Sequence, residues 1–266
     1  MKKLFIIGLG NMGTVILKGI VPQVLKEEDI SVYDVDKGRM SSFPNSKTEV
    51  VESIEEGAKN AENILLAVKP QNMENVLEKM TGTVSEKNLV VSIAAGNTIN
   101  YIKKILGGNI KVARVMPNLC VGVKKGVSAC CFGSNCTNKD KQFVDSLFKA
   151  VGITLTIDEN KMDIVTAISG SGPGYLFKIM EILIEIGKKE GLSEEDSAKL
   201  VYQTVSGSAA LAKNSDVSAK TLREKVTSKA GTTEAALKVM DEYKIEQMFC
   251  EAIKAAVNRA KELSKE

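Results

Sequence analysis

The sequence predicts an α/β protein, in which a doubly wound, mostly parallel sheet is followed by a second, all-helical half. Short runs rich in Val and Ile alternate with helical patterns up to Asp158, as in parallel sheets covered by helices on both faces. A glycine-rich turn joins the first run to the first helical pattern, and no convincing strand follows Asp158. We therefore expect one domain over residues 1–158 and a second over residues 159–266.

Strands are expected where four to eight residues favour β-structure and a Gly, Pro, Asn or Asp closes the run. In chain order these runs are Lys3–Ile7, Ile30–Asp34, Thr48–Val51, Asn63–Val68, Leu89–Ala94 and Lys111–Met116. Helical patterns between them occupy Asn11–Ile20, Gln71–Met80 and Thr98–Leu106. Two further runs, Gly126–Phe132 and Ile153–Ile157, should extend one edge of the sheet around a helix near Lys139–Val151.

The second half should consist of helices at Glu159–Ile168, Pro173–Glu190, Glu194–Lys213, Thr232–Met240 and Ile245–Leu263. In the helix over 173–190 the apolar residues spread beyond one narrow stripe, so we expect it to be buried on most sides. A second copy of the chain would supply some of the neighbours that it needs. The sequence therefore predicts a homodimer, or a higher homo-oligomer built from dimers.

Composition excludes several classes of function. The chain has 266 residues, a net charge of +3 and 44% apolar residues, which argues against disorder and gives no general reason to expect nucleic-acid or membrane binding. It has no histidine, so imidazole catalysis and histidine-ligated metals are excluded. Its five cysteines are irregularly spaced, so free thiols in a reducing cytoplasm are expected rather than disulfides or a metal site. No signal peptide or membrane span is evident.

The first strand runs into a glycine-rich segment that opens the first helix. Its residues are Gly8, Leu9, Gly10, Asn11, Met12 and Gly13, which match the G-x-G-x-x-G pattern in the context of a Rossmann-type dinucleotide fold. The first glycine permits a tight turn, the second a close approach of a pyrophosphate, and the third close packing of helix on strand. The helix N-terminus would then face the pyrophosphate.

The identity of the dinucleotide is left open by the residues after the second strand. Asp34 closes that strand, where a carboxylate accepts hydrogen bonds from the adenosine ribose and repels a 2′-phosphate. On this argument Asp34 favours NADH. Lys37 and Arg39 stand just beyond it and would pair with a phosphate if Asp34 turned away.

Several later segments are more specific than the glycine turn. They are Ala67-Val68-Lys69-Pro70-Gln71, Ser92-Ile93-Ala94-Ala95-Gly96, Arg114-Val115-Met116-Pro117-Asn118, Ser169-Gly170-Ser171-Gly172-Pro173-Gly174-Tyr175 and Val226-Thr227-Ser228-Lys229-Ala230-Gly231-Thr232-Thr233. Together with the glycine turn, and in this order, they make the chain resemble pyrroline-5-carboxylate reductase from Lys3 to about Ala256.

The resemblance implies a cytoplasmic NAD(P)H-dependent oxidoreductase that reduces the cyclic imine 1-pyrroline-5-carboxylate to L-proline, the last step of proline biosynthesis. It implies that the loop before the last two helices binds the substrate carboxylate and that Thr233 lies near the ring nitrogen, as proton donor or relay. The implied substrate contacts are Asn118, Ser228, Gly231, Thr232 and Thr233. Beside the glycine turn and Asp34, the implied cofactor contacts are Ala67, Val68, Lys69, Pro70 and Ala94. Members of this family mostly prefer NADPH.

The chain departs from the family pattern at two places. Lys229 and Ala230 stand where the family usually has Pro-Gly, and Leu119-Cys120 follow Asn118 where it commonly has Thr-Pro. Taken without the family, Thr232 or Thr233 would cap the helix that they open. The segment over 169–174 would be a helix start, with Pro173 in the first turn.

Two other functions are compatible with the glycine turn. A β-hydroxyacid dehydrogenase shares the start of the chain and has a catalytic lysine at the spacing of Lys178, but Ile182 stands where that family has asparagine. A non-catalytic sensor of the nicotinamide pool would keep the glycine turn and have no use for a carboxylate-binding loop.

Overall fold

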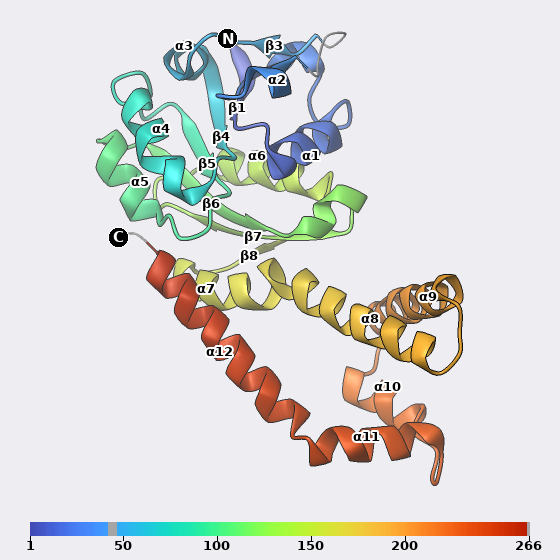
Figure 1. Ribbon diagram of the computed structural model, residues 1–266. Helices are drawn as coiled ribbons and strands as arrows, with labels where there is room; N and C mark the ends of the chain where they lie inside the picture. The colour runs from blue at the N-terminus through green and yellow to red at the C-terminus, as the bar shows by residue number, and fades with distance from the viewer. Residues whose placement is uncertain (42–46, 265–266) are drawn as a thin grey trace. The chain divides into compact units, whose positions relative to one another are not determined.

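The computed structural model describes residues 1–41 and 47–264, and the chain forms two compact units. The first, called the sheet unit, comprises Met1–Ser171 and the residues from Ala256 onward; the second, called the helical unit, comprises Gly172–Ala255. Figure 1 shows the elements of both units. The boundary expected at Asp158 follows the change from strands to helices, which is a different criterion, and it stays a prediction.

One sheet runs through the sheet unit, in the order β3-β2-β1-β4-β5-β6-β7-β8 over the described residues. Its strands are β1 (Lys2–Ile7), β2 (Ile30–Tyr33), β3 (Glu49–Val50), β4 (Ala61–Leu66), β5 (Leu89–Ser92), β6 (Lys111–Pro117), β7 (Gly126–Phe132) and β8 (Gly152–Thr156). The pair β6–β7 is antiparallel, and the other described pairs are parallel. The predicted doubly wound, mostly parallel sheet is thus confirmed. The order in which strands are added to the sheet reverses between β1 and β4, and such sheets bind ligands at this point.

Short and long helices connect the strands. They are α1 (Asn11–Ile20), α2 (Lys37–Met40), α3 (Ile54–Lys59), α4 (Met73–Met80), α5 (Ile99–Leu106), α6 (Asn138–Lys149) and α7 (Met162–Val165). Single 3₁₀ turns occur at Glu27–Asp29, Pro70–Asn72, Leu119–Val123 and Glu159–Lys161, and a π turn at Thr166–Gly170. The sequence did not predict α2 or α3, because four and six residues are too few to show a helical period.

The alternation of side chains along β1 builds two apolar layers, one on each face of the sheet. Leu4 and Ile6 pack in a cluster that includes the buried residues of α1 and α6. Phe5 and Ile7 pack in a second cluster, with the buried residues of α3, α4 and α5. All four side chains are at most 1% exposed, so both faces of this strand are covered, as a central parallel strand requires.

Three of the strands that end earlier than expected lead to the same place. The runs predicted to end at Asp34, Val68 and Ala94 leave the sheet at Tyr33, Leu66 and Ser92. In each case the residues just beyond the strand line one cavity at the carboxyl edge of the sheet. They have the composition of a strand, but they lie beyond its last paired residue and line that cavity.

The helical unit contains α8 (Gly172–Lys189), α9 (Glu194–Lys213), α10 (Ala219–Lys225), α11 (Thr232–Glu242) and most of α12 (Ile245–Leu263). Ser193 caps α9 and Ser218 caps α10 through their hydroxyls. The sequence did not predict α10. The helix start expected over 169–174 is confirmed, because α8 begins at Gly172 with Pro173 in its first turn, and a π turn precedes it up to Gly170.

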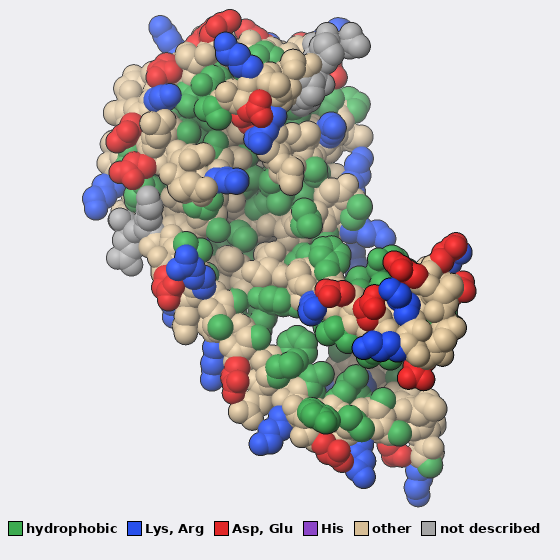
Figure 2. Space-filling view, viewed as in Figure 1, with side chains coloured by type: hydrophobic (Ala, Val, Ile, Leu, Met, Phe, Trp, Pro, Cys, Tyr) green, Lys and Arg blue, Asp and Glu red, His purple; other side chains and the backbone are tan. Residues whose placement is uncertain are grey.

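The helical unit has almost no core of its own. Every residue of this unit is described, and only Pro173 and Ser197 are buried. The helix expected to be buried on most sides is exposed in the single chain, and Figure 2 shows apolar side chains gathered on this unit. Its exposed large apolar residues include Leu176, Phe177, Ile179, Ile182, Leu183, Ile186, Leu200, Leu211, Val239 and Phe249. Apolar surface of this extent marks an interface with another chain.

Candidate functional site

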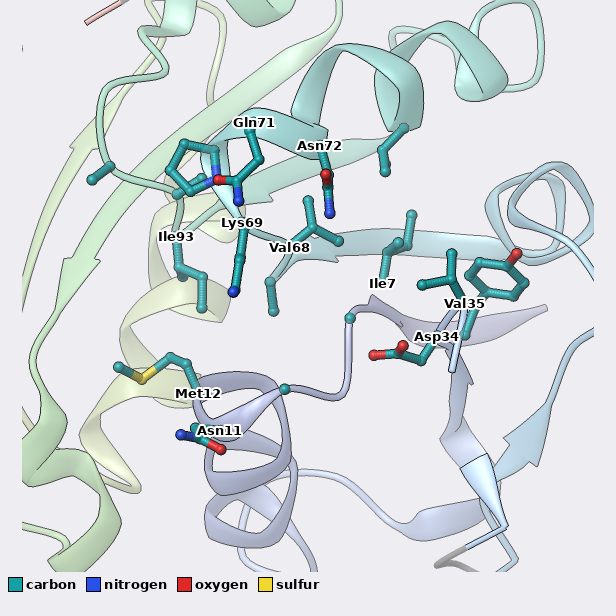
Figure 3. A pocket seen from close by; sticks show the side chains of 18 of the residues that line it. Ile7, Asn11, Met12, Asp34, Val35, Val68, Lys69, Gln71, Asn72 and Ile93 are labelled. Carbon is teal, nitrogen blue, oxygen red and sulfur yellow. The ribbon is translucent and has the colours of Figure 1, made fainter. Parts of the chain in front are cut away.

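A cavity of about 1230 Å³ opens at the carboxyl edge of the sheet, at the reversal between β1 and β4. Its described walls all belong to the sheet unit. In Figure 3, Asn11 and Met12 at the start of α1 lie on one side and Val68 and Lys69 after β4 on the other. This volume exceeds that of most small-ligand pockets, which hold about 300–1,000 Å³, so it has room for a dinucleotide.

The three glycines of the turn are needed for different reasons. Gly8 has φ +102°, and a Cβ there would stand 2.7 Å from the carbonyl oxygen of Ala67. A Cβ on Gly13 would stand 2.0 Å from the carbonyl oxygen of Gly8, so the first turn of α1 packs on the strand end with no room for a methyl group. Gly10 lines the cavity, and its missing side chain leaves the backbone open to a ligand.

The start of α1 is suited to an anion. Gly10 is the N-cap and provides no side-chain acceptor for the first-turn N–H groups, which a helix leaves without intrahelical partners. The hydroxyl of Thr14 donates to the carbonyl oxygen of Leu9 at 2.8 Å, which fixes the turn. Asn11 and Met12 line the cavity, whereas Leu9 is buried and Gly13 lies beneath the turn. The glycine turn can therefore hold a pyrophosphate.

Asp34 lines the cavity directly after β2 and is only 5% exposed. Its Oδ2 accepts a hydrogen bond from the backbone N–H of Leu9 at 2.6 Å, and its Oδ1 accepts one from the N–H of Asp36 at 2.8 Å. The guanidinium of Arg39 lies 3.5 Å from Oδ2. The carboxylate is therefore tied to the glycine turn by the fold itself.

The remaining cofactor candidates also face this cavity. Ala67, Val68, Lys69 and Pro70 line it from the end of β4, and Ala94 from the end of β5. Sequence reasoning did not single out several other lining residues, namely Tyr33, Val35, Asn72, Asn75, Val76 and Lys79. Val35 could have been predicted, because it lies just after the end of a strand. The residues of α4 carried no signal, because only the packing of this helix brings them here. Met116 and Gly170, which belong to two of the motif segments, also line the cavity.

Asn118 lines the cavity after β6 and is 9% exposed. Its Oδ1 accepts a hydrogen bond from the N–H of Val127 at 3.3 Å. One end of this amide therefore ties the strand end to β7. The side chain is held in place rather than solvated.

The other substrate candidates lie in the helical unit, in the loop before α11. Gly231 donates its N–H to the carbonyl oxygen of Ser228 at 3.0 Å, which closes a tight turn. Ala230 within it has φ +59°, a left-handed conformation that costs a non-glycine residue about 1–2 kcal/mol. The family has glycine at this place, and Ala230 adopts the conformation that favours glycine.

The expected capping of α11 by threonine is wrong. Gly231 is the N-cap, in extended conformation and without a side-chain cap, so Thr232 and Thr233 occupy the first two helical positions. Glu234 instead reaches back, and its Oε2 accepts from the N–H of Ala230 at 2.7 Å. Because the glycine makes the entry into the helix, neither threonine hydroxyl serves as its cap.

The two cysteines within β7, Cys130 and Cys131, are not suited to thiolate chemistry. All five cysteines are free. Burial, with smaller contributions from Asp145 and Cys131, raises the pKa of Cys130 to about 12. Burial and Glu159 raise the pKa of Cys131 to about 12, so neither is a thiolate near neutral pH.

Comparison with known proteins gives two family matches and close relatives along the whole chain. Residues 159–263 match the family described as pyrroline-5-carboxylate reductase dimerisation, and residues 3–96 match the family described as NADP oxidoreductase coenzyme F420-dependent. Pyrroline-5-carboxylate reductase of Staphylococcus haemolyticus is 35% identical, over 99% of this chain and 98% of the relative. The chain belongs to the pyrroline-5-carboxylate reductase family.

Solved structures agree with this membership. The pyrroline-5-carboxylate reductase of Coxiella burnetii has a TM-score of 0.93 at 35% identity, over 100% of this chain and 99% of that one. The pyrroline carboxylate reductase of Plasmodium falciparum, solved with NADP bound, has a TM-score of 0.90 at 33% identity, over 99% and 98% of the two chains. Membership in the pyrroline-5-carboxylate reductase family decides against a β-hydroxyacid dehydrogenase, and Lys178 pairs with Glu181 on the exposed surface of α8.

Proposed function

We propose that this chain reduces 1-pyrroline-5-carboxylate to L-proline with a reduced nicotinamide cofactor. The observation that carries the proposal is family membership along the whole chain, together with a glycine turn shaped for a pyrophosphate at the edge of a dinucleotide-sized cavity. When bound, the cofactor supplies the hydride that the imine carbon needs.

The residues of the sheet unit bind and orient the cofactor. The first-turn N–H groups of α1, beyond Gly10, hold the pyrophosphate. Asp34 lies at the adenosine end of the cavity, and Val68, Lys69, Pro70 and Ala94 line its other walls. Placing the nicotinamide against the imine is the main contribution of these residues, since positioning removes much of the entropic cost of the reaction.

The loop before α11 binds the substrate. The first-turn N–H groups of α11, which no side chain caps, and the hydroxyl of Ser228 would hold the carboxylate, at a helix start that attracts anions. The hydroxyl of Thr233 would hydrogen-bond the ring nitrogen and hold or deliver the proton that this atom takes up. This role is supported by the family resemblance and by the free capping position, which leaves the hydroxyl unused by the helix start.

We also propose that the helical unit joins two copies of the chain, and that dimers are the building block of any larger assembly. The match to a dimerisation family and the missing core of this unit support it. Among the described residues no helix is long and apolar enough to cross a bilayer. Five free cysteines, two of them buried side by side, fit a reducing compartment such as the cytoplasm.

The test is the initial rate of oxidation of NADPH and of NADH by the purified chain, with 1-pyrroline-5-carboxylate as substrate. Oxidation that depends on the imine supports the proposal. Cofactor binding without oxidation of either cofactor would contradict it and would favour a sensor of the nicotinamide pool.

A further inference from the structure

The carboxylate of Asp34, directly after β2, is held in place by backbone hydrogen bonds. Both oxygens of Asp34 accept backbone N–H groups, from Leu9 at 2.6 Å and from Asp36 at 2.8 Å. Both hydrogen bonds form only while the carboxylate points toward the glycine turn. The side chain is only 5% exposed, so it has little room to adopt another rotamer. In this site an acidic residue after β2 is therefore a brace of the phosphate-binding turn, and its presence alone does not decide against a 2′-phosphate.

A cation faces this carboxylate from the next turn of the chain. Nη1 of Arg39 lies 3.5 Å from Oδ2 of Asp34, and Nε lies 3.3 Å from Oδ2 of Asp36. Nη1 also stands 3.7 Å from the place that a Cβ on Gly10 would take. The guanidinium thus lines the cavity above the turn, with the side chain 51% exposed.

We propose that Arg39 is the residue that selects between the two nicotinamide cofactors, by binding the 2′-phosphate of NADPH beside the braced Asp34. This inference rests on the proposed function and names the cofactor that the site prefers. A guanidinium binds phosphate through paired, charge-assisted hydrogen bonds. Arg39 also offsets the negative charges of Asp34 and Asp36, which would otherwise repel a phosphate at this place.

Removing the guanidinium should therefore weaken only the binding of ligands that carry a 2′-phosphate. In Arg39→Gln the attraction is lost and the repulsion by the two aspartates is exposed, so both changes weaken binding of a 2′-phosphate. A ligand with a ribose hydroxyl at that place carries no charge there, and its affinity should stay the same. Lys37 is the matched control, since it belongs to the same short helix α2 and does not line the cavity among the residues described.

The test compares pairs of ligands that differ only by the 2′-phosphate, on the whole chain, by isothermal titration calorimetry. The pairs are adenosine 2′,5′-bisphosphate with AMP, and NADP⁺ with NAD⁺. In Arg39→Gln we expect the dissociation constants of adenosine 2′,5′-bisphosphate and NADP⁺ to rise by about tenfold or more, as loss of a charge-assisted pair implies. Those of AMP and NAD⁺ should stay within about twofold, and in Lys37→Gln all four should do so.

Three outcomes would overturn the inference: equal weakening within each pair, no weakening in Arg39→Gln, or the same selective weakening in Lys37→Gln. Thermal unfolding of each variant checks that it is folded. These binding measurements involve no imine. A chain that discriminates the 2′-phosphate through Arg39 but does not reduce the imine would contradict the proposed function and leave this inference standing. If Arg39→Gln reduces the imine with an unchanged cofactor preference, the result would contradict this inference and leave the proposed function standing.

Discussion

Replacing Gly13 with alanine tests the glycine turn at its tightest point. The added Cβ would stand 2.0 Å from the carbonyl oxygen of Gly8, 3.1 Å from its carbonyl carbon and 3.2 Å from the Cβ of Ala67. Non-bonded heavy atoms prefer separations of about 3.5–4.0 Å, so the helix start and the strand end must part by more than about 1 Å. The nearest of these atoms are backbone atoms, and no change of rotamer relieves the clash.

The expected size of the effect follows from two opposing contributions. Overpacking in a rigid place costs about 1–3 kcal/mol, and alanine recovers up to about 1 kcal/mol because it favours a helix over glycine. We therefore expect the free energy of unfolding to fall by about 1–2 kcal/mol. The displaced turn no longer aims its N–H groups at the pyrophosphate, so the dissociation constant for NADP⁺ should rise by about tenfold or more, which is about 1.4 kcal/mol.

Chemical denaturation measures the loss of stability, and calorimetric titration with NADP⁺ measures the loss of affinity. Lys18→Ala, on the exposed side of the same helix, is the control and should change neither quantity by more than about 0.5 kcal/mol. Unchanged affinity for NADP⁺ in a folded Gly13→Ala variant would refute the reasoning, because the turn would then not be the cradle of the pyrophosphate.

Three more predictions concern the substrate loop, a helix cap and the buried thiols. Thr233→Ala should lower turnover more at high pH than at low pH, because the imine loses its own proton as pH rises and then depends on a donor. Thr137 is the N-cap of α6, and its hydroxyl and backbone N–H both donate to the carboxylate of Asp140. Thr137→Ala should reduce the free energy of unfolding by about 1 kcal/mol near neutral pH. Burial raises the pKa of Asp140, but hydrogen bonds from Thr137 and from Lys111 outweigh it and lower the pKa below its ordinary value. The stabilisation that comes with a lowered pKa is lost as falling pH protonates the carboxylate. The difference between Thr137→Ala and the unchanged chain should therefore shrink below about pH 4. At pH 8, Cys130 and Cys131 should resist alkylation in the folded chain and react once it is unfolded, since their pKa values are about 12.

Each of these predictions has its own contrary result. Equal loss of turnover at every pH in Thr233→Ala would remove the donor role and leave the residue only a positioning role. A stability difference in Thr137→Ala that persists unchanged into acid would show that Asp140 does not act through this cap. Alkylation of Cys130 in the folded chain, followed by mass spectrometry of its peptides, would show that the thiol is accessible and ionises more readily than its surroundings indicate.

The sheet and the glycine turn could be predicted because local sequence determines them. Alternating Val and Ile runs, each followed by a turn, defined the long strands, and the spacing of Gly8, Gly10 and Gly13 defined the turn that the structure displays. The exact strand ends could not be predicted. Asp34 and Ala94 have neighbours that favour β-structure, but the cavity requires their backbone to leave the ladder.

Other features depend on contacts that no short segment encodes. Asn75, Val76 and Lys79 reach the cavity only through the packing of α4. Arg39 was ambiguous in the sequence, because only the structure shows that the carboxylate of Asp34 is held by two backbone N–H groups. The apolar residues of α8 predicted burial on most sides with help from a second copy, and they are exposed in the single chain; their periodicity does not tell which chain covers them.

The most direct test of the central claim is to identify the product. The purified chain is incubated with 1-pyrroline-5-carboxylate and NADPH, and L-proline is quantified by chiral chromatography beside the NADPH that is consumed. We predict one L-proline for each NADPH oxidised, and none without the imine or without the chain. NADPH binding with no proline formed, under conditions in which a known reductase of this family is active, would contradict the claim.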